Sequence, residues 1–227
     1  MKLFGLDSQS ILSRVEASTV RPRVFTWREA MVTGGVGFGL VSTVVFATVA
    51  WGERVMYSSL GQVGAYLVWT ALFILGGGFA LGRLVIGTGG LLRFYGFFAT
   101  GFLFYSAIWM TSYFLIRGII GEVIGTVAAG MLLGFLYLVA FDVKKAGAGV
   151  VFAVMFGSTS GYFLGRVIWL AIPGPAGMVG WGVAYGLLLG LGLSFAIYLA
   201  QASVREALAG KKAPGPLAKE TAPSATA

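Results

Sequence analysis

The chain has 227 residues, of which 58% are hydrophobic and only 11% are charged, and its net charge is +8. This composition excludes an ordinary soluble domain, because the apolar residues gather in blocks long enough for a helix to cross a membrane, about 20 residues each. The chain contains no cysteine and no histidine. These absences exclude disulfides, thiolate and imidazole metal sites, and every catalytic scheme that uses histidine.

The first 28 residues are mostly polar and precede the first apolar block. Within them, Leu6, Ile11, Leu12 and Val15 share roughly one helical face, and the basic run RPR follows at 21–23. This pattern favours a short amphipathic helix on anionic lipid, with docking to a partner as the alternative. We expect 1–28 to form a basic cytoplasmic arm.

Six apolar segments follow, and each is close to the length of one membrane crossing. They occupy 30–51, 60–82, 93–116, 119–141, 147–171 and 176–200. Their many glycines suit helices in lipid, where the backbone must satisfy its own hydrogen bonds and small residues let helices approach closely. We predict an all-α integral membrane domain of six transmembrane helices over 29–201. A disordered cytoplasmic tail is predicted over 202–227, which is rich in Ala, Pro, Lys and Thr.

Basic residues are concentrated before the first segment, after the last one, and in the second and fourth connections. The other connections hold only Arg54 and Arg117, with Arg166 just inside the fifth segment. By the positive-inside rule, both termini are cytoplasmic and the protein is a multi-pass protein of the cytoplasmic (inner) membrane. The positive charge is thereby explained without a nucleic-acid partner.

An internal repeat appears when the chain is shifted by 83 residues. The segment 64–86 then falls on 147–169 without a gap, and eight of the 23 positions are identical, including Gly-x-x-Leu-Gly-Arg at 78–83 and 161–166. The matched segments are the second and fifth, which cross the membrane in opposite directions. We therefore predict a 3+3 inverted-topology repeat with halves 30–116 and 119–200, an architecture that recurs in transporters. Chance similarity in a biased composition is the alternative.

Arg83 and Arg166 follow the shared glycine motif, and the topology places them at opposite mouths of a solute path between the second and fifth segments. Such cations favour anionic or polar solutes; the alternative is that both side chains snorkel to the interface. Glu122 lies on the same side as Arg166, and we expect these two charges to pair. The alternative for Glu122 is an ordinary loop position. Polar residues of the fifth segment complete the candidate path: Ser158, Thr159 and Ser160.

Two glycine patterns are also informative. Ridges with four-residue spacing, Gly157, Gly161, Gly165 and Gly182, Gly186, Gly190, predict tight helix packing, with a homo-oligomer or partner interface as the alternative. The triple glycine Gly76, Gly77, Gly78 predicts a break in the second segment and joins the candidate path.

No catalytic motif is recognisable: there is no pair of acids within a segment, no nucleophile beside a base, no metal-ligand spacing and no phosphate loop. We therefore predict that the chain is not an enzyme and needs no cofactor. The leading hypothesis is a small channel or transporter for a polar or anionic solute. The alternative is a non-catalytic accessory subunit of a larger membrane complex, and the lipid bilayer is a partner in either case.

Overall fold

The computed structural model describes residues 4–210, and within this range every regular element is a helix. The elements are α1 (Ser8–Glu16), α2 (Trp27–Gly82), α3 (Gly90–Leu115), α4 (Gly118–Phe141), α5 (Gly147–Ala171), α6 (Pro175–Ala200) and α7 (Ala202–Gly210). Five of them, α2 to α6, are long and apolar enough to cross a membrane. The prediction of an all-helical fold is therefore confirmed within this range, and the five long apolar helices support the membrane class.

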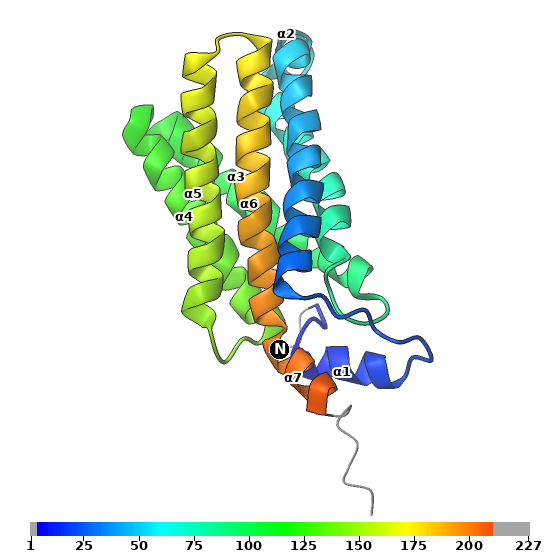
Figure 1. Ribbon diagram of the computed structural model, residues 1–227. Helices are drawn as coiled ribbons and strands as arrows, with labels where there is room; N and C mark the ends of the chain where they lie inside the picture. The colour runs from blue at the N-terminus through cyan, green and yellow to red at the C-terminus, as the bar shows by residue number, and fades with distance from the viewer. Residues whose placement is uncertain (1–3, 211–227) are drawn as a thin grey trace, which may run out of the picture.

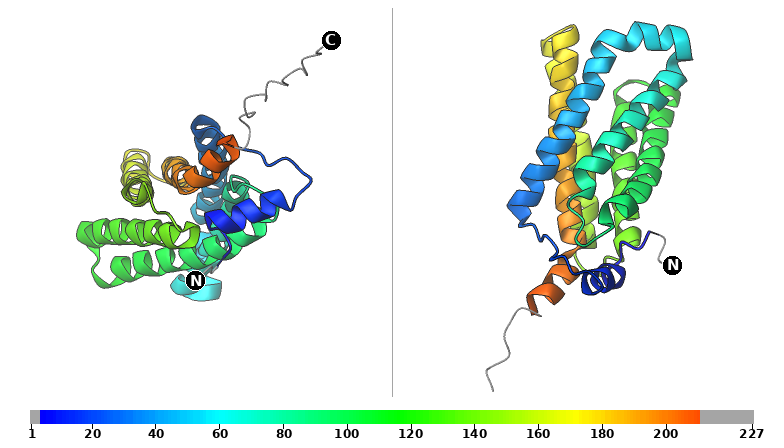
Figure 2. Two further views of the ribbon diagram at one scale, coloured as in Figure 1. Left: turned by 90° about the horizontal axis from the view of Figure 1, so that it is seen from below. Right: turned by 90° about the vertical axis from the view of Figure 1, so that its right-hand side faces the viewer.

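The helix α2 contains the first two predicted segments and folds back on itself at Gly61, whose backbone is non-helical, with φ of 68° and ψ of 173°. The arm before Gly61 and the arm after it run side by side in opposite directions (Figure 2). The Phe38 and Phe73 rings, one from each arm, stack with their centroids 5.7 Å apart. One long helix is thus two antiparallel arms joined at a single glycine.

Replacing Gly61 with alanine is expected to lower the free energy of unfolding by about 1–3 kcal/mol, because this backbone conformation is open essentially to glycine alone. A Cβ at Gly61 would meet nothing within 4 Å, so the cost is conformational rather than steric. The matched control is Gly52→Ala, since Gly52 is helical and also has open space. That change should be neutral or stabilising by up to about 1 kcal/mol. Unfolding of the purified protein by sodium dodecyl sulfate measures both, and equal effects would contradict a special role for Gly61.

The remaining long helices alternate in direction, so that α1, α7 and the loops 83–89 and 142–146 all lie at one end of the bundle (Figure 1). Most basic residues in the described range lie at or near this end: Arg14, Arg21, Arg23, Arg28, Arg83, Arg93, Lys144, Lys145 and Arg205. We call it the basic end. The reversal at Gly61 and the α3–α4 and α5–α6 connections lie at the opposite end.

The apolar face of α1 packs on the protein itself. Leu6 and Ile11 are buried, and Ile11 forms a small core with Ile86 of the loop 83–89 and Val204 of α7. Gln201 holds the same region together, since its side chain accepts a hydrogen bond from the Ile86 backbone N–H and donates one to the Leu84 carbonyl. The apolar face that predicted a lipid or partner contact is therefore largely occupied by the chain's own residues.

Glycines bring α6 into close contact with two neighbours. A Cβ on Gly186 would collide with Ser42 and lie 3.0 Å from the Cα of Gly39 on the first arm of α2. On the other side, a Cβ on Gly157 of α5 would lie 3.2 Å from the Cα of Gly192. Backbones that approach this closely leave no room for side chains. Both predicted ridges thus face partners within the chain: the Gly157 ridge faces α6 and the Gly182 ridge faces α2.

Two sequence expectations need correction. The triple glycine 76–78 is helical rather than broken, and a Cβ on each of its residues would meet a different neighbour: Val41, Phe38 or Tyr95. The glycines therefore serve close packing, which regular helix permits. Residues 202–210 of the predicted disordered tail form α7, because Val204 has an apolar partner surface on α1. The remainder of that prediction, 211–227, lies outside the described residues.

Candidate functional site

A partly buried ion pair joins α4 to α5 at the end of the bundle opposite the basic end. Arg166 Nε lies 3.0 Å from Glu122 Oε2, and the two side chains are 34% and 12% exposed, respectively. The two helices are antiparallel neighbours, so the first turns of α4 lie beside the last turns of α5. The pairing expected from the sequence is confirmed. Within the described residues Glu122 Oε2 accepts no hydrogen bond, so the positive charge of Arg166 is what compensates the negative charge of this buried oxygen.

Hydroxyl groups continue inward from this pair. The Thr126 hydroxyl donates a hydrogen bond to the backbone carbonyl of Glu122. The Ser158 hydroxyl donates one to the backbone carbonyl of Thr126, at 3.5 Å. The Tyr105 hydroxyl lies 2.7 Å from Ser158 Oγ and 2.9 Å from the Tyr185 hydroxyl. Because the Ser158 proton is directed to Thr126, the consistent arrangement has Tyr185 donating to Tyr105 and Tyr105 donating to Ser158. We call Glu122, Arg166, Thr126, Ser158, Tyr105 and Tyr185 the polar line.

Helical periodicity explains why these side chains share one interior face. Ser158, Tyr162 and Arg166 follow one another at four-residue intervals on α5, and Glu122 and Thr126 do the same on α4. Residues four apart lie on one side of a helix, so two facing stripes form where α4 meets α5. The helices α3 and α6 supply the two tyrosines, and four helices therefore meet at the inner end of the polar line.

Aromatic rings line the same half of the bundle. The Tyr162 ring centroid lies 5.9 Å from that of Trp109 and 5.2 Å from that of Trp181. These tyrosine and tryptophan side chains surround the ion pair and the hydroxyls with apolar rings, each of which carries a single polar O–H or N–H group. The site is therefore closed and packed in this conformation.

A stack of phenyl rings follows the polar line toward the basic end. Phe102 stacks on Tyr105 with centroids 5.2 Å apart, Phe98 stacks on Phe102 at 5.3 Å, and Phe94 stacks on Phe98 at 5.6 Å. All three phenylalanines are at most 2% exposed. We call Phe94, Phe98 and Phe102 the phenyl stack. It offers no polar atom to water or to a solute.

Only part of the predicted site comes together. Arg166, Glu122 and Ser158 belong to the polar line, whereas Ser160 bonds to the Phe156 carbonyl of its own helix. The Thr159 hydroxyl is buried without a partner among the described residues. The helix α5 packs against α4 and α6 rather than against α2, so the second and fifth segments are not packed together as the expected path requires.

Arg83 lies at the basic end, exposed, with its guanidinium 3.8 Å from the ring centroid of Phe79 one turn earlier. Among the described residues, Arg83 has no acidic partner equivalent to Glu122. The 83-residue shift that matches Arg83 with Arg166 matches Gly39 with Glu122, and glycine carries no charge. The glycines of the shared motif do behave alike, because Gly82 faces Leu91 of the next helix and Gly165 faces Trp181 of the next helix. The inverted repeat stays a prediction, and the charged part of the site belongs to the second half alone.

Tyr105, Tyr185, Thr126 and Tyr162 were missed by the sequence reasoning. A usable signal was present in the four-residue spacing of polar side chains within the apolar segments, such as Glu122 to Thr126 and Ser158 to Arg166. Nothing in the spacing revealed that α3 and α6 supply the hydroxyls between these stripes. That information depends on which helices are neighbours.

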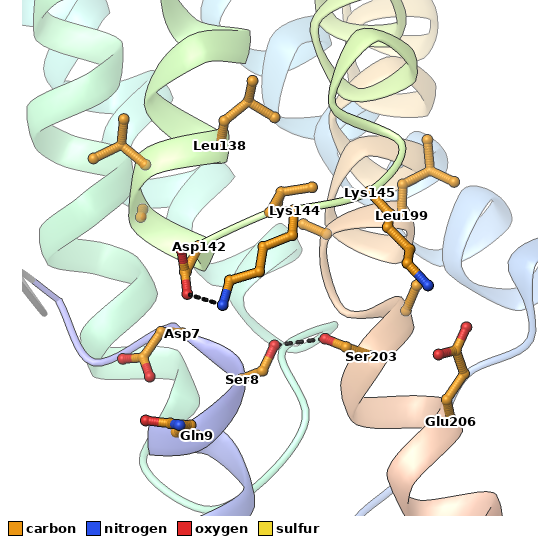
Figure 3. A pocket seen from close by; sticks show the side chains of 15 residues that line it. Asp7, Ser8, Gln9, Leu138, Asp142, Lys144, Lys145, Leu199, Ser203 and Glu206 are labelled. Carbon is orange, nitrogen blue, oxygen red and sulfur yellow. Dashed lines mark hydrogen bonds and ion pairs between the residues drawn. The ribbon is translucent and has the colours of Figure 1, made fainter.

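A separate open pocket of about 760 Å³ lies at the basic end (Figure 3). It is bordered by the ends of α4 and α6, the loop 142–146, α1 and α7, and it contains side chains of both charges. Elsewhere on α7, burial lowers the pKa of Arg205, which remains a cation at neutral pH because the ordinary pKa of arginine is so high. Among residues 4–210, no three acidic, histidine or cysteine side chains are grouped to hold a metal ion.

Compared with family models, with curated proteins and with solved structures, the chain matches none of them.

Proposed function

We propose that this protein is a gated passage for a small polar or anionic solute, with six membrane crossings, both termini cytoplasmic, and a closed conformation in the structure described here. The two arms of α2 supply two of the crossings, and α3 to α6 supply four. One observation carries the functional proposal: a line of charged and hydroxyl groups enters the bundle from one end and stops at a stack of phenyl rings.

The chemistry of the line suits a hydrated anion or a polyol better than a metal cation. Arg166 is the more exposed member of the ion pair, while the Glu122 carboxylate is already neutralised by it. The hydroxyls of Tyr105, Ser158 and Tyr185 can exchange their mutual hydrogen bonds for bonds to a solute. A purely apolar constriction such as the phenyl stack closes a pore by excluding water.

Opening requires displacement of one face of α3. The rings of Phe94, Phe98 and Phe102 recur every four residues, so they move together when α3 rotates or shifts. Replacing a ring of the stack with a small polar side chain should therefore bypass the gate.

The test is flux through proteoliposomes that contain the purified full chain. We expect Phe102→Ser to raise chloride efflux or glycerol permeability at least about tenfold over the unmodified protein, since the substitution removes a ring from the barrier and supplies a hydroxyl. The matched control is Phe156→Ser, because Phe156 is a half-exposed phenylalanine on the outer surface of α5. Flux equal to that of empty vesicles from both the unmodified protein and Phe102→Ser, with helical content retained, would refute the proposal.

An accessory subunit of a membrane complex is the second candidate, and the dense packing of the bundle favours it. The pocket of about 760 Å³ lies outside the bundle interior, and a second pocket, lined by Ala30, Ile197 and Tyr198 among others, has a volume of only about 10 Å³. A bundle without a conduit would serve as a scaffold, and the absence of flux in every arm of the vesicle experiment would select this role. Neither proposal assigns catalytic chemistry to the chain.

A further inference from the structure

The segment 18–28 joins α1 to the first turn of α2, and we call it the linker. From the end of α1 it swings out to the side of the long helices before it returns to the start of α2 (Figures 1 and 2). It has no regular secondary structure before Trp27, where α2 begins. The linker therefore stands at the basic end beside the apolar helices, at the level where headgroups surround a membrane protein.

The linker is strongly basic. It contains Arg21, Arg23 and Arg28 and no acidic residue. All three arginines are exposed, and none forms an ion pair in the described part of the chain. The acid that follows, Glu29, is engaged in capping α2, since its carboxylate accepts hydrogen bonds from the N–H and the hydroxyl of Thr26. Three positive charges thus stand close together in sequence with no carboxylate within ion-pair distance.

Large apolar side chains of the linker are exposed between these charges. Val20 is 65% exposed, Val24 is 41% exposed and Trp27 is 48% exposed, whereas Phe25 is buried in the main core and fixes the linker to the bundle. Apolar area left in water is unfavourable, and tryptophan is enriched at the interface between membrane and water. The exposed side of the linker is therefore suited to the boundary between headgroups and acyl chains.

Two of the arginines are held over aromatic rings. Arg23 Cζ lies 4.4 Å from the ring centroid of Phe25, and Arg28 Cζ lies 5.2 Å from that of Trp27. A guanidinium above a ring keeps the N–H donors at its edge available, and these donors match phosphate oxygens in bidentate geometry. The rings thus position the arginines for phosphates without using their hydrogen bonds.

We propose that the linker lies on the membrane surface and binds anionic phospholipid, with Val20, Val24 and Trp27 at the boundary of the acyl chains and the arginines on lipid phosphates. The contact with anionic lipid that the sequence suggested for α1 is then made by the linker, because the apolar face of α1 is occupied by the chain itself. This inference does not depend on the proposed solute passage, because the linker lies outside the bundle interior.

A spin label in the linker tests the proposal, and the chain suits the method because it contains no cysteine. The full chain with Val24→Cys is labelled with a nitroxide and placed, one copy per disc, in lipid nanodiscs of phosphatidylcholine with or without phosphatidylglycerol. The label's collisions with oxygen, which concentrates in lipid, are compared with its collisions with a neutral nickel chelate, which stays in water. We expect the label to enter lipid when phosphatidylglycerol is present and to leave it at high salt, which screens the attraction.

The charge dependence is measured with Arg21→Gln and Arg23→Gln together, introduced beside the label. This double variant should shift the label's equilibrium about thirtyfold toward water, as the loss of two basic residues near an anionic surface predicts. The matched control is Lys144→Gln with Lys145→Gln, which removes the same charge from exposed positions at the same end and should leave the label in lipid. A label at Ala209→Cys, at the exposed end of α7, should report water in both lipids.

Three results would overturn the proposal. A label at Val24→Cys with the same depth in both lipids shows that anionic lipid is not recognised. An equal loss of depth in the arginine and lysine variants shows that only the total charge of the basic end matters. Shielding of the label that appears only in discs with two copies assigns this surface to a second copy of the chain.

Discussion

Gly186→Leu is expected to prevent stable packing of α6 against the first arm of α2. Even a Cβ at this position would collide with Ser42 and press on the backbone of Gly39, and neither α6 nor α2 can yield locally because both are continuous helices there. Overpacking in a dense core costs about 1–3 kcal/mol and more when backbone must move. We expect most of the expressed protein to aggregate in mild detergent, as measured by size-exclusion chromatography of the solubilised chain.

The matched control for this prediction is Gly52→Leu, which makes the same change on α2 where nothing lies within 4 Å. That variant should elute as a single species in normal yield. If the two variants behave alike, the loss reflects the added hydrophobic residue rather than the contact between α2 and α6.

Arg166→Met is expected to lower the free energy of unfolding by about 1–3 kcal/mol, because it leaves the Glu122 carboxylate partly buried without its cation. Breaking a fully buried pair costs about 3–5 kcal/mol. The cost here is smaller because Arg166 is about one-third exposed and water screens it. Titration with sodium dodecyl sulfate, followed by tryptophan fluorescence, gives the difference.

The double variant Glu122→Gln with Arg166→Met separates charge from packing. It removes both charges while keeping similar shapes, so it should recover most of the stability lost in Arg166→Met. Arg54→Met, at an exposed arginine of the same end, should have little effect. A double variant as unstable as Arg166→Met would show that the arginine stabilises by its packing alone.

The sequence predicted the pairing of Glu122 with Arg166 for a reason that can be traced. Segment lengths and the alternation of basic connections place the start of the fourth segment and the end of the fifth at the same side of the membrane. Two opposite charges at that depth then have few other partners. The same reasoning gave Arg83 surroundings like those of Arg166, because it assumed that matched sequence positions have matched neighbours, whereas the Arg83 guanidinium lies over the Phe79 ring. Gly39 stands where a second acid would be needed.

The glycines illustrate what spacing alone leaves open. Four-residue spacing at Gly182, Gly186 and Gly190 predicted a close helix contact, but it could not say that the partner is α2. The triple glycine at 76–78 suggested a break by its low helix propensity. The chain instead reverses at the single Gly61, whereas three different neighbours pack against the triple glycine. Tertiary contacts override propensity wherever a small residue is needed for close approach.

The amino-acid sequence by itself determined that this protein is helical and suited to a membrane, where its apolar segments lie, and which connections share a basic end. These properties depend on local composition, because hydrocarbon thickness sets segment length and backbone hydrogen bonding requires helices. Only the tertiary structure decided that Tyr105, Ser158 and Tyr185 meet in the interior and that α1 and α7 close a pocket with the loop 142–146. In lipid every helix has a similar apolar surface, so the choice of neighbours depends on the fit of glycines, rings and hydroxyls across helices distant in sequence.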